Sequence, residues 1–322
     1  MPVKIGFVGV GGIAHAHIHN LRQIPGTELV AFADLNRSRA KAVADRFGGR
    51  AYRDWRKMYD NEELDAVYIC VPPHGHVGQE QAAAKRGWHL FIEKPIANDL
   101  AVAKRIARAI RQSGVISSVG YHWRYYDTSD RARALLKGKT IGMVLGYWLG
   151  TMPGVPWWRV MRQSGGQMVE QTTHIFDLAR YLVGEVKRVH AAYSLQALKH
   201  VPKLTVPDVG TAILEFHNGA IGQISTTCLL NQGYSVGLRV LTPELIIESD
   251  GGSLRVVEPG HTAQFQSAVS PTMMEDQVFV RAVRTGRAGA IRSGYDDALK
   301  TLAVTLAANQ SAKTVKAVRV IA

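Results

Sequence analysis

The spacing of apolar residues changes near position 121 and divides the chain into two halves. Up to that point, short unbroken apolar runs alternate with amphipathic helical segments. Such runs are typical of strands buried on both faces of a parallel sheet. The pattern predicts an N-terminal doubly wound Rossmann domain over residues 1–121, with strands over 3–10, 28–34, 65–73, 89–95 and 114–121.

After position 121, the apolar runs become longer and follow one another directly, over 142–150, 186–195, 209–229 and 234–258. The pair Asn218-Gly219 between alternating apolar residues is a strong hairpin signal, and residues 250–252 read as a second turn. We therefore expect an α+β domain over 122–322, with a large, mainly antiparallel open sheet covered on one face by helices near 167–183, 272–286 and 295–309. Its uncovered face predicts a homodimer or homotetramer, so this domain would serve substrate binding and oligomerisation.

Composition narrows the function classes. The chain has 322 residues, 46% of them hydrophobic, and no window resembles a membrane span or a signal peptide. Its two cysteines lie far apart, which favours a reduced compartment, so we expect a cytoplasmic protein. The net charge of +13 is spread along amphipathic helices without aromatic interleaving. This favours a solvated basic surface, with neither nucleic acid nor membrane as partner.

A glycine motif follows the first predicted strand. The residues Gly9-x-Gly11-x-x-Ala14 open a helical stretch, and Asp34 ends the second strand twenty residues beyond Ala14. Gly9 would allow the tight turn, Gly11 the close approach of a pyrophosphate, and Ala14 close helix packing. Asp34 would accept hydrogen bonds from a ribose and repel a 2′-phosphate. The context predicts a dinucleotide site that prefers NAD, while Arg37 and Arg39 keep NADP possible.

Three histidines in the same segment raise the alternative of a metal site. On a helix, His15 and His19 share a face while His17 points the opposite way, so the three cannot converge on one ion. We therefore expect no metal, and interpret these histidines as packing or surface residues of the first helix.

The segment 167–183 carries the densest candidate chemistry. If it forms one helix, Glu170, His174, Asp177 and Tyr181 fall within a narrow arc. The arc could be an ordinary solvated face. A carboxylate one turn before a histidine is, however, a plausible way to orient a general base.

The preceding loop, 152–166, contains Trp157, Trp158 and Arg159 among prolines and glycines. Burial of the tryptophans in a regular core is not expected there. Aromatic rings stack on sugar faces, so substrate contact is one interpretation, and a packing loop at an oligomer contact is the other.

These features together resemble the Gfo/Idh/MocA family of oxidoreductases, which includes glucose–fructose oxidoreductase and inositol dehydrogenases. The resemblance rests on the glycine motif, on Glu93-Lys94-Pro95, on "VGYHWRY" (119–125) and on "THIFDLARYL" (173–182). It spans nearly the whole chain.

The resemblance implies NAD(P)-dependent hydride transfer at a secondary hydroxyl or ketone of a sugar, inositol or glycoside. Lys94 would orient the hydroxyl, His174 would act as acid/base, and Glu170 would complete the catalytic set. The residues expected at the cofactor are Gly9, Gly11, Gly12, Ile13, Ala14, Asp34, Arg37, Pro72, His76, Glu93, Lys94, Trp123 and Arg124. Those expected at the substrate are Tyr121, Trp157, Trp158, Arg159 and Asp177.

One departure from the family pattern leaves the substrate open. The family usually carries aspartate four residues before the histidine, often as Asp-x-Gly-x-His, where this chain has Glu170 and no glycine. A larger substrate, such as a glycoside or anhydrosugar, would fit this change. Two alternatives remain: a non-catalytic NAD(P)-binding sensor with the same fold, and a dehydrogenase of an acidic sugar or nucleotide-sugar.

Overall fold

The computed structural model describes residues 1–322, which form two compact units. The first unit comprises residues 1–97, 101–122 and 270–298, and the second comprises 98–100, 123–269 and 299–322. The sequence boundary at 121 thus lies next to a boundary of the structure. The segment 270–298, which the sequence assigned to the second domain, groups with the first unit.

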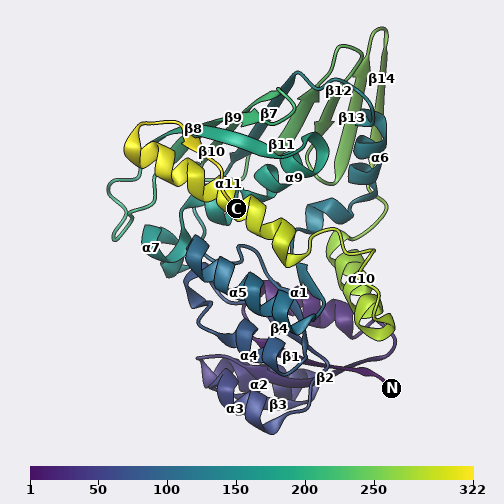
Figure 1. Ribbon diagram of the computed structural model, residues 1–322. Helices are drawn as coiled ribbons and strands as arrows, with labels where there is room; N and C mark the ends of the chain where they lie inside the picture. Colours follow the sequence, from purple (N-terminus) through teal and green to yellow (C-terminus); the bar gives the residue numbers. More distant parts are fainter. The chain divides into compact units, whose positions relative to one another are not determined.

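The first unit contains one parallel sheet of six strands in the order β3-β2-β1-β4-β5-β6 (Figure 1). This order confirms the doubly wound fold, with the crossover beside β1. The strands are β1 (Val3–Val8), β2 (Thr27–Ala33), β3 (Arg50–Tyr52), β4 (Ala66–Ile69), β5 (His89–Ile92) and β6 (Ser117–Val119). The helices are α1 (Gly12–Leu21), α2 (Arg37–Phe47), α3 (Trp55–Asn61), η1 (Pro73–Gly75), α4 (Gln79–Lys85), α5 (Leu100–Ser113) and α10 (Pro271–Thr285).

Helix α10 corrects one expectation from the sequence, because it does not cover the antiparallel sheet. Its buried residues Phe279 and Val280 belong to the core of the first unit, where the Phe279 ring meets Tyr68 and Phe91 edge-on. The apolar stripe of this segment predicts an amphipathic helix, but it does not predict which of the two sheets the helix covers.

The second unit contains a nine-stranded sheet in the order β14-β13-β12-β11-β7-β10-β9-β8-β15. Only the pair β10–β7 is parallel, so the expected mainly antiparallel sheet is confirmed. The strands are β7 (Met143–Leu149), β8 (Val186–Ser194), β9 (Val209–Phe216), β10 (Ile221–Thr227), β11 (Ser235–Leu241), β12 (Ile246–Ser249), β13 (Ser253–Glu258), β14 (His261–Gln266) and β15 (Val318–Arg319).

Burial alternates along these strands, since one face of the sheet packs against helices and the other is open. The covered face shares a core with α9, α6 and the later turns of α11, whereas Met143, Ile213 and Ile221 on the strands are exposed. The helical segments are η2 (His122–Tyr125), α6 (Asp127–Leu136), η3 (Pro156–Arg159), α7 (Met161–Ser164), α8 (Gln167–Glu170), α9 (Thr173–Val183) and α11 (Tyr295–Thr314). Helix α11 begins in the first unit and continues in the second. None of the helices has the length and apolar character needed to cross a bilayer.

The expected single helix over 167–183 is in fact two, α8 and α9, separated at Gln171 and Thr172. The carbonyl of Thr172 accepts from both Ile175 and Phe176, and so starts the second helix. The apolar face of α9 is buried as the periodicity predicts, by Ile175, Leu178, Ala179 and Leu182. Glu170 and His174 therefore do not share one regular helix.

Candidate functional site

In the first unit, the candidate residues gather where the parallel strands end. Gly9 follows β1, Asp34 follows β2, Pro72 follows β4 and Lys94 follows β5. Because the strands are parallel, all of these positions lie at one edge of the sheet. In open α/β sheets that edge is where ligands bind.

The glycine turn after β1 has the shape that a pyrophosphate requires. Gly9 has φ of +84°, and a Cβ there would lie 2.4 Å from the carbonyl oxygen of Cys70, so only glycine fits. A Cβ at Gly11 or Gly12 would meet nothing within 4 Å. Helix α1 begins at Gly12 without a side-chain cap, and its first amides are therefore available to an anion. The expected packing position, Ala14, is fully buried, while Ile13 is exposed.

Asp34 lies beside this turn. One of its oxygens accepts from the amide of Val10 at 3.1 Å, and the other accepts from the amide of Asn36 at 2.8 Å. These bonds fix the carboxylate at the end of β2. Arg39 approaches it at 3.4 Å from an exposed position, and Arg37 is exposed as well. The turn and the acid together fit a dinucleotide whose ribose hydroxyls bind Asp34.

The segment after β4 supports the cofactor assignment only in part. Pro72 is half-buried and precedes the short helix η1. The His76 side chain is fully covered and forms a hydrogen bond with Glu80. Its imidazole therefore has no exposed face, and the expected side-chain contact with a cofactor is not supported.

Glu93 and Lys94 follow β5. The Glu93 carboxylate accepts from the backbone amide of Lys94 at 3.1 Å and lies 3.1 Å from Nε2 of His17. Lys94 is half-buried and Tyr121, after β6, is buried. Burial is the main reason that the pKa of His122 falls to about 4, which leaves this neighbouring imidazole neutral at pH 7.

In the second unit, His174 lies beside two tryptophans. Its ring is nearly parallel to the rings of Trp123 and Trp148, with centroid distances of 6.0 Å and 6.1 Å. The histidine is 4% exposed, at the start of α9. The two indoles restrict the tilt of the imidazole. A fixed tilt would suit a residue that exchanges a proton with one particular atom.

Glu170 has a partner that the sequence did not suggest. Its carboxylate accepts a hydrogen bond from the indole nitrogen of Trp158 at 2.8 Å. Trp158 is fully buried with Val206 and Cys228, which was not expected in this loop and favours packing over substrate contact for its ring. The segment after β8 returns over the loop and covers this ring. Trp157 is half-buried at the edge of the same cluster, and Arg159 is half-buried next to it.

Asp177 and Arg124 form a buried ion pair. The guanidinium donates from Nε at 2.7 Å and from Nη2 at 2.6 Å, and Thr301 adds a third hydrogen bond to the same carboxylate at 2.8 Å. Both side chains are under 5% exposed. The pair therefore tethers η2 to α9, and does not support the expected roles of Arg124 at the cofactor and Asp177 at the substrate.

Three residues in these surroundings were not assigned a role at the site from the sequence: His17, His122 and Trp148. His122 lies within the quoted "VGYHWRY" motif, whose pattern could have indicated it. Trp148 lies on β7, where nothing in the local pattern distinguishes it from any strand residue. His17 was interpreted as a packing residue, and its partners lie 76 and 259 positions away.

Comparison with known proteins agrees with this architecture. Residues 3–121 match the profile described as "Oxidoreductase family, NAD-binding Rossmann fold", and residues 129–255 match the GFO/IDH/MocA C-terminal domain. The chain is 29% identical to the myo-inositol 2-dehydrogenase of Thermotoga maritima, across 74% of this chain and 72% of the relative. It is 26% identical to the scyllo-inositol 2-dehydrogenase (NAD(+)) of Bacillus subtilis, across 96% and 94%.

A solved structure of levoglucosan dehydrogenase in complex with NADH superposes with a TM-score of 0.90 at 21% identity, and covers 100% of both chains. That likeness confirms the fold of both units. The two family profiles together span most of the sequence, and the resemblance read from the motifs is confirmed. This chain belongs to the Gfo/Idh/MocA family of oxidoreductases and carries that family's NAD-binding Rossmann fold.

Proposed function

We propose that this protein transfers a hydride between NAD and a secondary hydroxyl or ketone of an inositol, sugar or glycoside, with Lys94 and His174 as its catalytic residues. One observation supports this most directly. The open glycine turn, Asp34 and Lys94 all lie at the carboxyl ends of strands in one parallel sheet. That arrangement provides a dinucleotide site and a cation at the same sheet edge.

The cofactor would lie along the first of these features. The amides at the start of α1 would bind the pyrophosphate, and Asp34 would bind the adenosine ribose. An acid at that position disfavours a 2′-phosphate, so NAD is preferred over NADP. When bound, the nicotinamide supplies the acceptor or donor of the hydride.

Lys94 would act on the reacting oxygen. As the hydroxyl proton is withdrawn, negative charge develops on the oxygen, and it is relieved as the hydride leaves the carbon. An ammonium group beside that oxygen stabilises the charge and orients the hydroxyl. Lys94 is half-buried, which strengthens such an interaction relative to bulk water.

His174 would exchange the proton. In the oxidation direction, the neutral imidazole accepts the hydroxyl proton, and in reduction the imidazolium returns it. The parallel rings of Trp123 and Trp148 fix the plane of the imidazole. Glu170 bonds to Trp158, and we propose that it thereby holds the loop over 152–166 in place.

The substrate class follows from the relatives. The names of the curated relatives include inositol 2-dehydrogenase, levoglucosan dehydrogenase and D-glucoside 3-dehydrogenase. All of these act on cyclic compounds with several hydroxyl groups, and we propose a substrate of this class. Trp157 and Arg159 would contact it from the loop, and the presence of both Lys94 and His174 favours turnover over a binding-only sensor.

The open face of the second sheet supports a further part of the proposal. Met143, Ile213 and Ile221 expose apolar side chains there, and a second copy of the chain would cover them. We propose a homodimer or homotetramer that works in the cytoplasm. Sedimentation at several protein concentrations would test the association.

The test of function begins with the purified protein. A denatured sample is analysed for released nicotinamide cofactor, and the remainder is assayed for NADH absorbance with NAD and a panel of inositols, sugars and glycosides. The proposal expects NADH formation with at least one class of substrate.

The matched control is Lys94→Ala, which should bind NAD with nearly unchanged affinity and lose turnover. Tight NAD binding without turnover on any member of the panel, in either direction, would favour the sensor. No binding of any dinucleotide would contradict the proposal entirely.

A further inference from the structure

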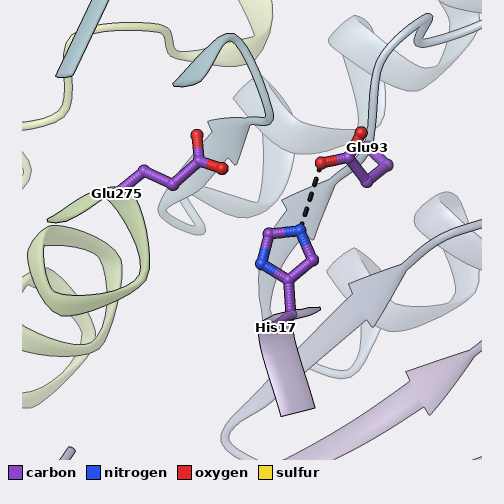
Figure 2. A group of neighbouring side chains, drawn as sticks. All are labelled: His17, Glu93 and Glu275. Carbon is purple, nitrogen blue, oxygen red and sulfur yellow. Dashed lines mark hydrogen bonds and ion pairs between the residues drawn. The ribbon is translucent and has the colours of Figure 1, made fainter. Parts of the chain in front are cut away.

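A cluster of four ionisable side chains lies buried in the first unit: His17, Glu93, Glu275 and Asp276, here called the His17 cluster. Figure 2 shows three of them, with His17 on α1 pointing toward Glu93 after β5 and with Glu275 on α10 facing the pair. None of the four is more than 4% exposed. Buried charges are costly unless they are paired, so this cluster requires a physical account.

Both ring nitrogens of His17 face carboxylates. Nδ1 lies 2.8 Å and 3.0 Å from the two oxygens of Asp276, and Nε2 lies 3.1 Å from Glu93. An ionised carboxylate can only accept a hydrogen bond, so each ring nitrogen must carry a proton. The geometry thus describes an imidazolium. Burial by itself lowers the pKa of His17, but the two carboxylates outweigh burial and raise it well above its ordinary value.

Two further donors surround the carboxylate of Asp276. Asn20 donates to one oxygen at 2.9 Å, and the Tyr68 hydroxyl donates to the other at 3.1 Å. Together with His17, these donors supply both carboxylate oxygens. Both oxygens of this buried carboxylate therefore have hydrogen-bond partners.

Glu275 differs from the other two acids. It is fully buried, and neither carboxylate oxygen has a hydrogen-bond partner. Burial raises its pKa well above the ordinary value, and the nearby charges of Glu93 and Asp276 add to this against the attraction of His17. Burial without a hydrogen-bond partner therefore favours the neutral form of Glu275, and the hydrogen bonds place the His17 imidazolium between the carboxylates of Glu93 and Asp276.

A divalent metal is the competing occupant. One ligand atom from each of His17, Glu93 and Glu275 can be chosen so that all lie within 4.8 Å of one another. A metal would replace the proton on Nε2 and the proton on Glu275, and so would leave the net charge unchanged. The direct hydrogen bond between His17 and Glu93 favours the proton.

The cluster reaches Lys94 through Glu93. One oxygen of Glu93 bonds to His17, and the other accepts from the backbone amide of Lys94. The carboxylate also packs closely on Gly120, where a Cβ would lie only 2.2 Å from it. Glu93 is thus held by three contacts. Removal of His17 would leave its buried carboxylate without a cation, which favours displacement of the side chain toward solvent.

We infer that His17 is a positioning residue: as an imidazolium, it clamps Glu93 and thereby fixes the backbone from which Lys94 projects. The inference rests on the proposed role of Lys94 in hydride transfer. His17 also lies on the same helix as the glycine turn, and Asp276 connects it to α10. One imidazolium therefore ties together the helix at the pyrophosphate site, the strand end that carries Lys94, and a helix from far along the sequence.

The test compares His17→Gln with His19→Gln. His19 lies on the same helix and is exposed, so the control removes a histidine without disturbing the cluster. We expect His17→Gln to lower kcat on the order of 10–100-fold, measured per bound NAD, with the Kd for NAD changed less than about threefold. His19→Gln should match the wild type. An equal loss in both variants, or an unchanged kcat in His17→Gln, would overturn the inference.

The double variant His17→Gln/Glu93→Gln separates positioning from general destabilisation. Two amides can bond to each other, and the amide at position 93 can still accept from the Lys94 amide, so no unpaired charge is left at position 93. Asp276 keeps its hydrogen bonds from Asn20 and Tyr68 in both the single and the double variant. We expect the double variant to regain at least part of the kcat that the single variant loses. A double variant less active than His17→Gln would contradict the clamp.

A second readout does not depend on activity. In protein labelled with ¹⁵N-histidine, the resonances assigned through His17→Gln should show both nitrogens protonated at pH 8. A neutral His17 at pH 8 would overturn the inference, as would one equivalent of divalent metal in the purified protein. If the wild type turns over no substrate, the proposed function fails, and the NMR result still decides the state of His17.

Discussion

Two buried histidines, one in each unit, are held in opposite ways. In the first unit, His17 is held by its ring nitrogens, each of which faces a carboxylate. In the second unit, the ring of His174 lies beside the indoles of Trp123 and Trp148 and is nearly parallel to both. Both are less than 5% exposed, so burial does not distinguish them.

The difference shows which surroundings suit a histidine with a permanent charge and which suit a histidine that exchanges a proton. Carboxylates on both nitrogens retain both protons, which suits a structural cation and excludes a base. Nearly parallel aromatic neighbours restrict the tilt of a ring without fixing its charge, which suits the exchange of a proton. The comparison therefore agrees with both proposals, a permanent charge on His17 and proton transfer by His174.

The largest effect should follow replacement of the stacked histidine. His174→Ala removes the proposed acid/base, and we expect kcat to fall about 10²–10⁴-fold, the range for loss of such a group. The Kd for NAD should stay within about threefold, because no cofactor contact is proposed for this side chain. Steady-state kinetics and NAD titration measure both quantities. A fall in kcat of less than tenfold would contradict the comparison, because His174 would then not act as the acid/base.

Replacement of Lys94 should have the next largest effect. Lys94→Ala removes the cation at the developing alkoxide, and we expect kcat to fall about 10²–10³-fold. Lys94→Arg keeps the positive charge but replaces the compact ammonium by a planar guanidinium, and its kcat should remain well below that of the wild type. Recovery of most of the activity in the arginine variant would show that charge alone, without position, is sufficient.

The buried ion pair of the second unit should matter to stability. Asp177→Asn leaves Arg124 as an uncompensated buried cation, and we expect the free energy of unfolding to fall by about 3–5 kcal/mol. Urea titration measures the change. The control, Asp45→Asn, breaks an exposed pair with Lys41 and should cause no measurable change. Equal effects in the two variants would mean that burial does not govern these pairs.

A third histidine extends the comparison to pH. Burial lowers the pKa of His122 to about 4 in the folded state, while the unfolded chain protonates it near pH 6.5. Between these values the unfolded state binds the extra proton, so stability is lost as the pH falls from 6.5 toward 4. The linkage amounts to about 3 kcal/mol.

His122→Gln should remove that part of the pH dependence. The measurement is the difference in free energy of unfolding between wild type and variant at pH 7 and at pH 4.5, in which the other titrating groups cancel. A difference that does not change with pH would show that His122 titrates normally.

The smallest effect should come from Trp158→Phe, which keeps a buried ring and removes the hydrogen bond to Glu170. We expect a loss of about 1 kcal/mol in unfolding free energy, and a kcat within twofold of the wild type. If kcat fell strongly, the hydrogen bond between Trp158 and Glu170 would contribute to catalysis as well as to the stability of the loop.

The fold was largely predictable from local pattern. Apolar runs revealed the strands of both sheets, and Asn218-Gly219 indeed joins an antiparallel pair, β9 and β10. The errors concern features that pattern cannot encode. The amphipathic stripe of α10 does not say which sheet it covers, and the break at Gln171 and Thr172 leaves the helical periodicity of the polar residues intact.

The site was predictable only where one short segment carries the chemistry. The glycine turn and Asp34 were read from spacing, because a strand, a turn and an acid occur within a few dozen residues. Contacts between residues far apart in the sequence could not be predicted in this way. Trp158 is buried by a segment some forty residues later, and the nitrogens of His17 meet Asp276 across 259 positions.

The central claim is that this chain moves a hydride between a secondary carbinol and NAD. The most direct test uses the substrate identified by the panel, deuterated at its carbinol carbons, with mass spectrometry of the reduced nicotinamide after turnover. The account predicts one deuterium per NADH in the wild type, and about 10²–10³-fold less deuterated NADH in the same time with Lys94→Ala. NADH without deuterium, or turnover that leaves every carbinol deuterium in place, would contradict it.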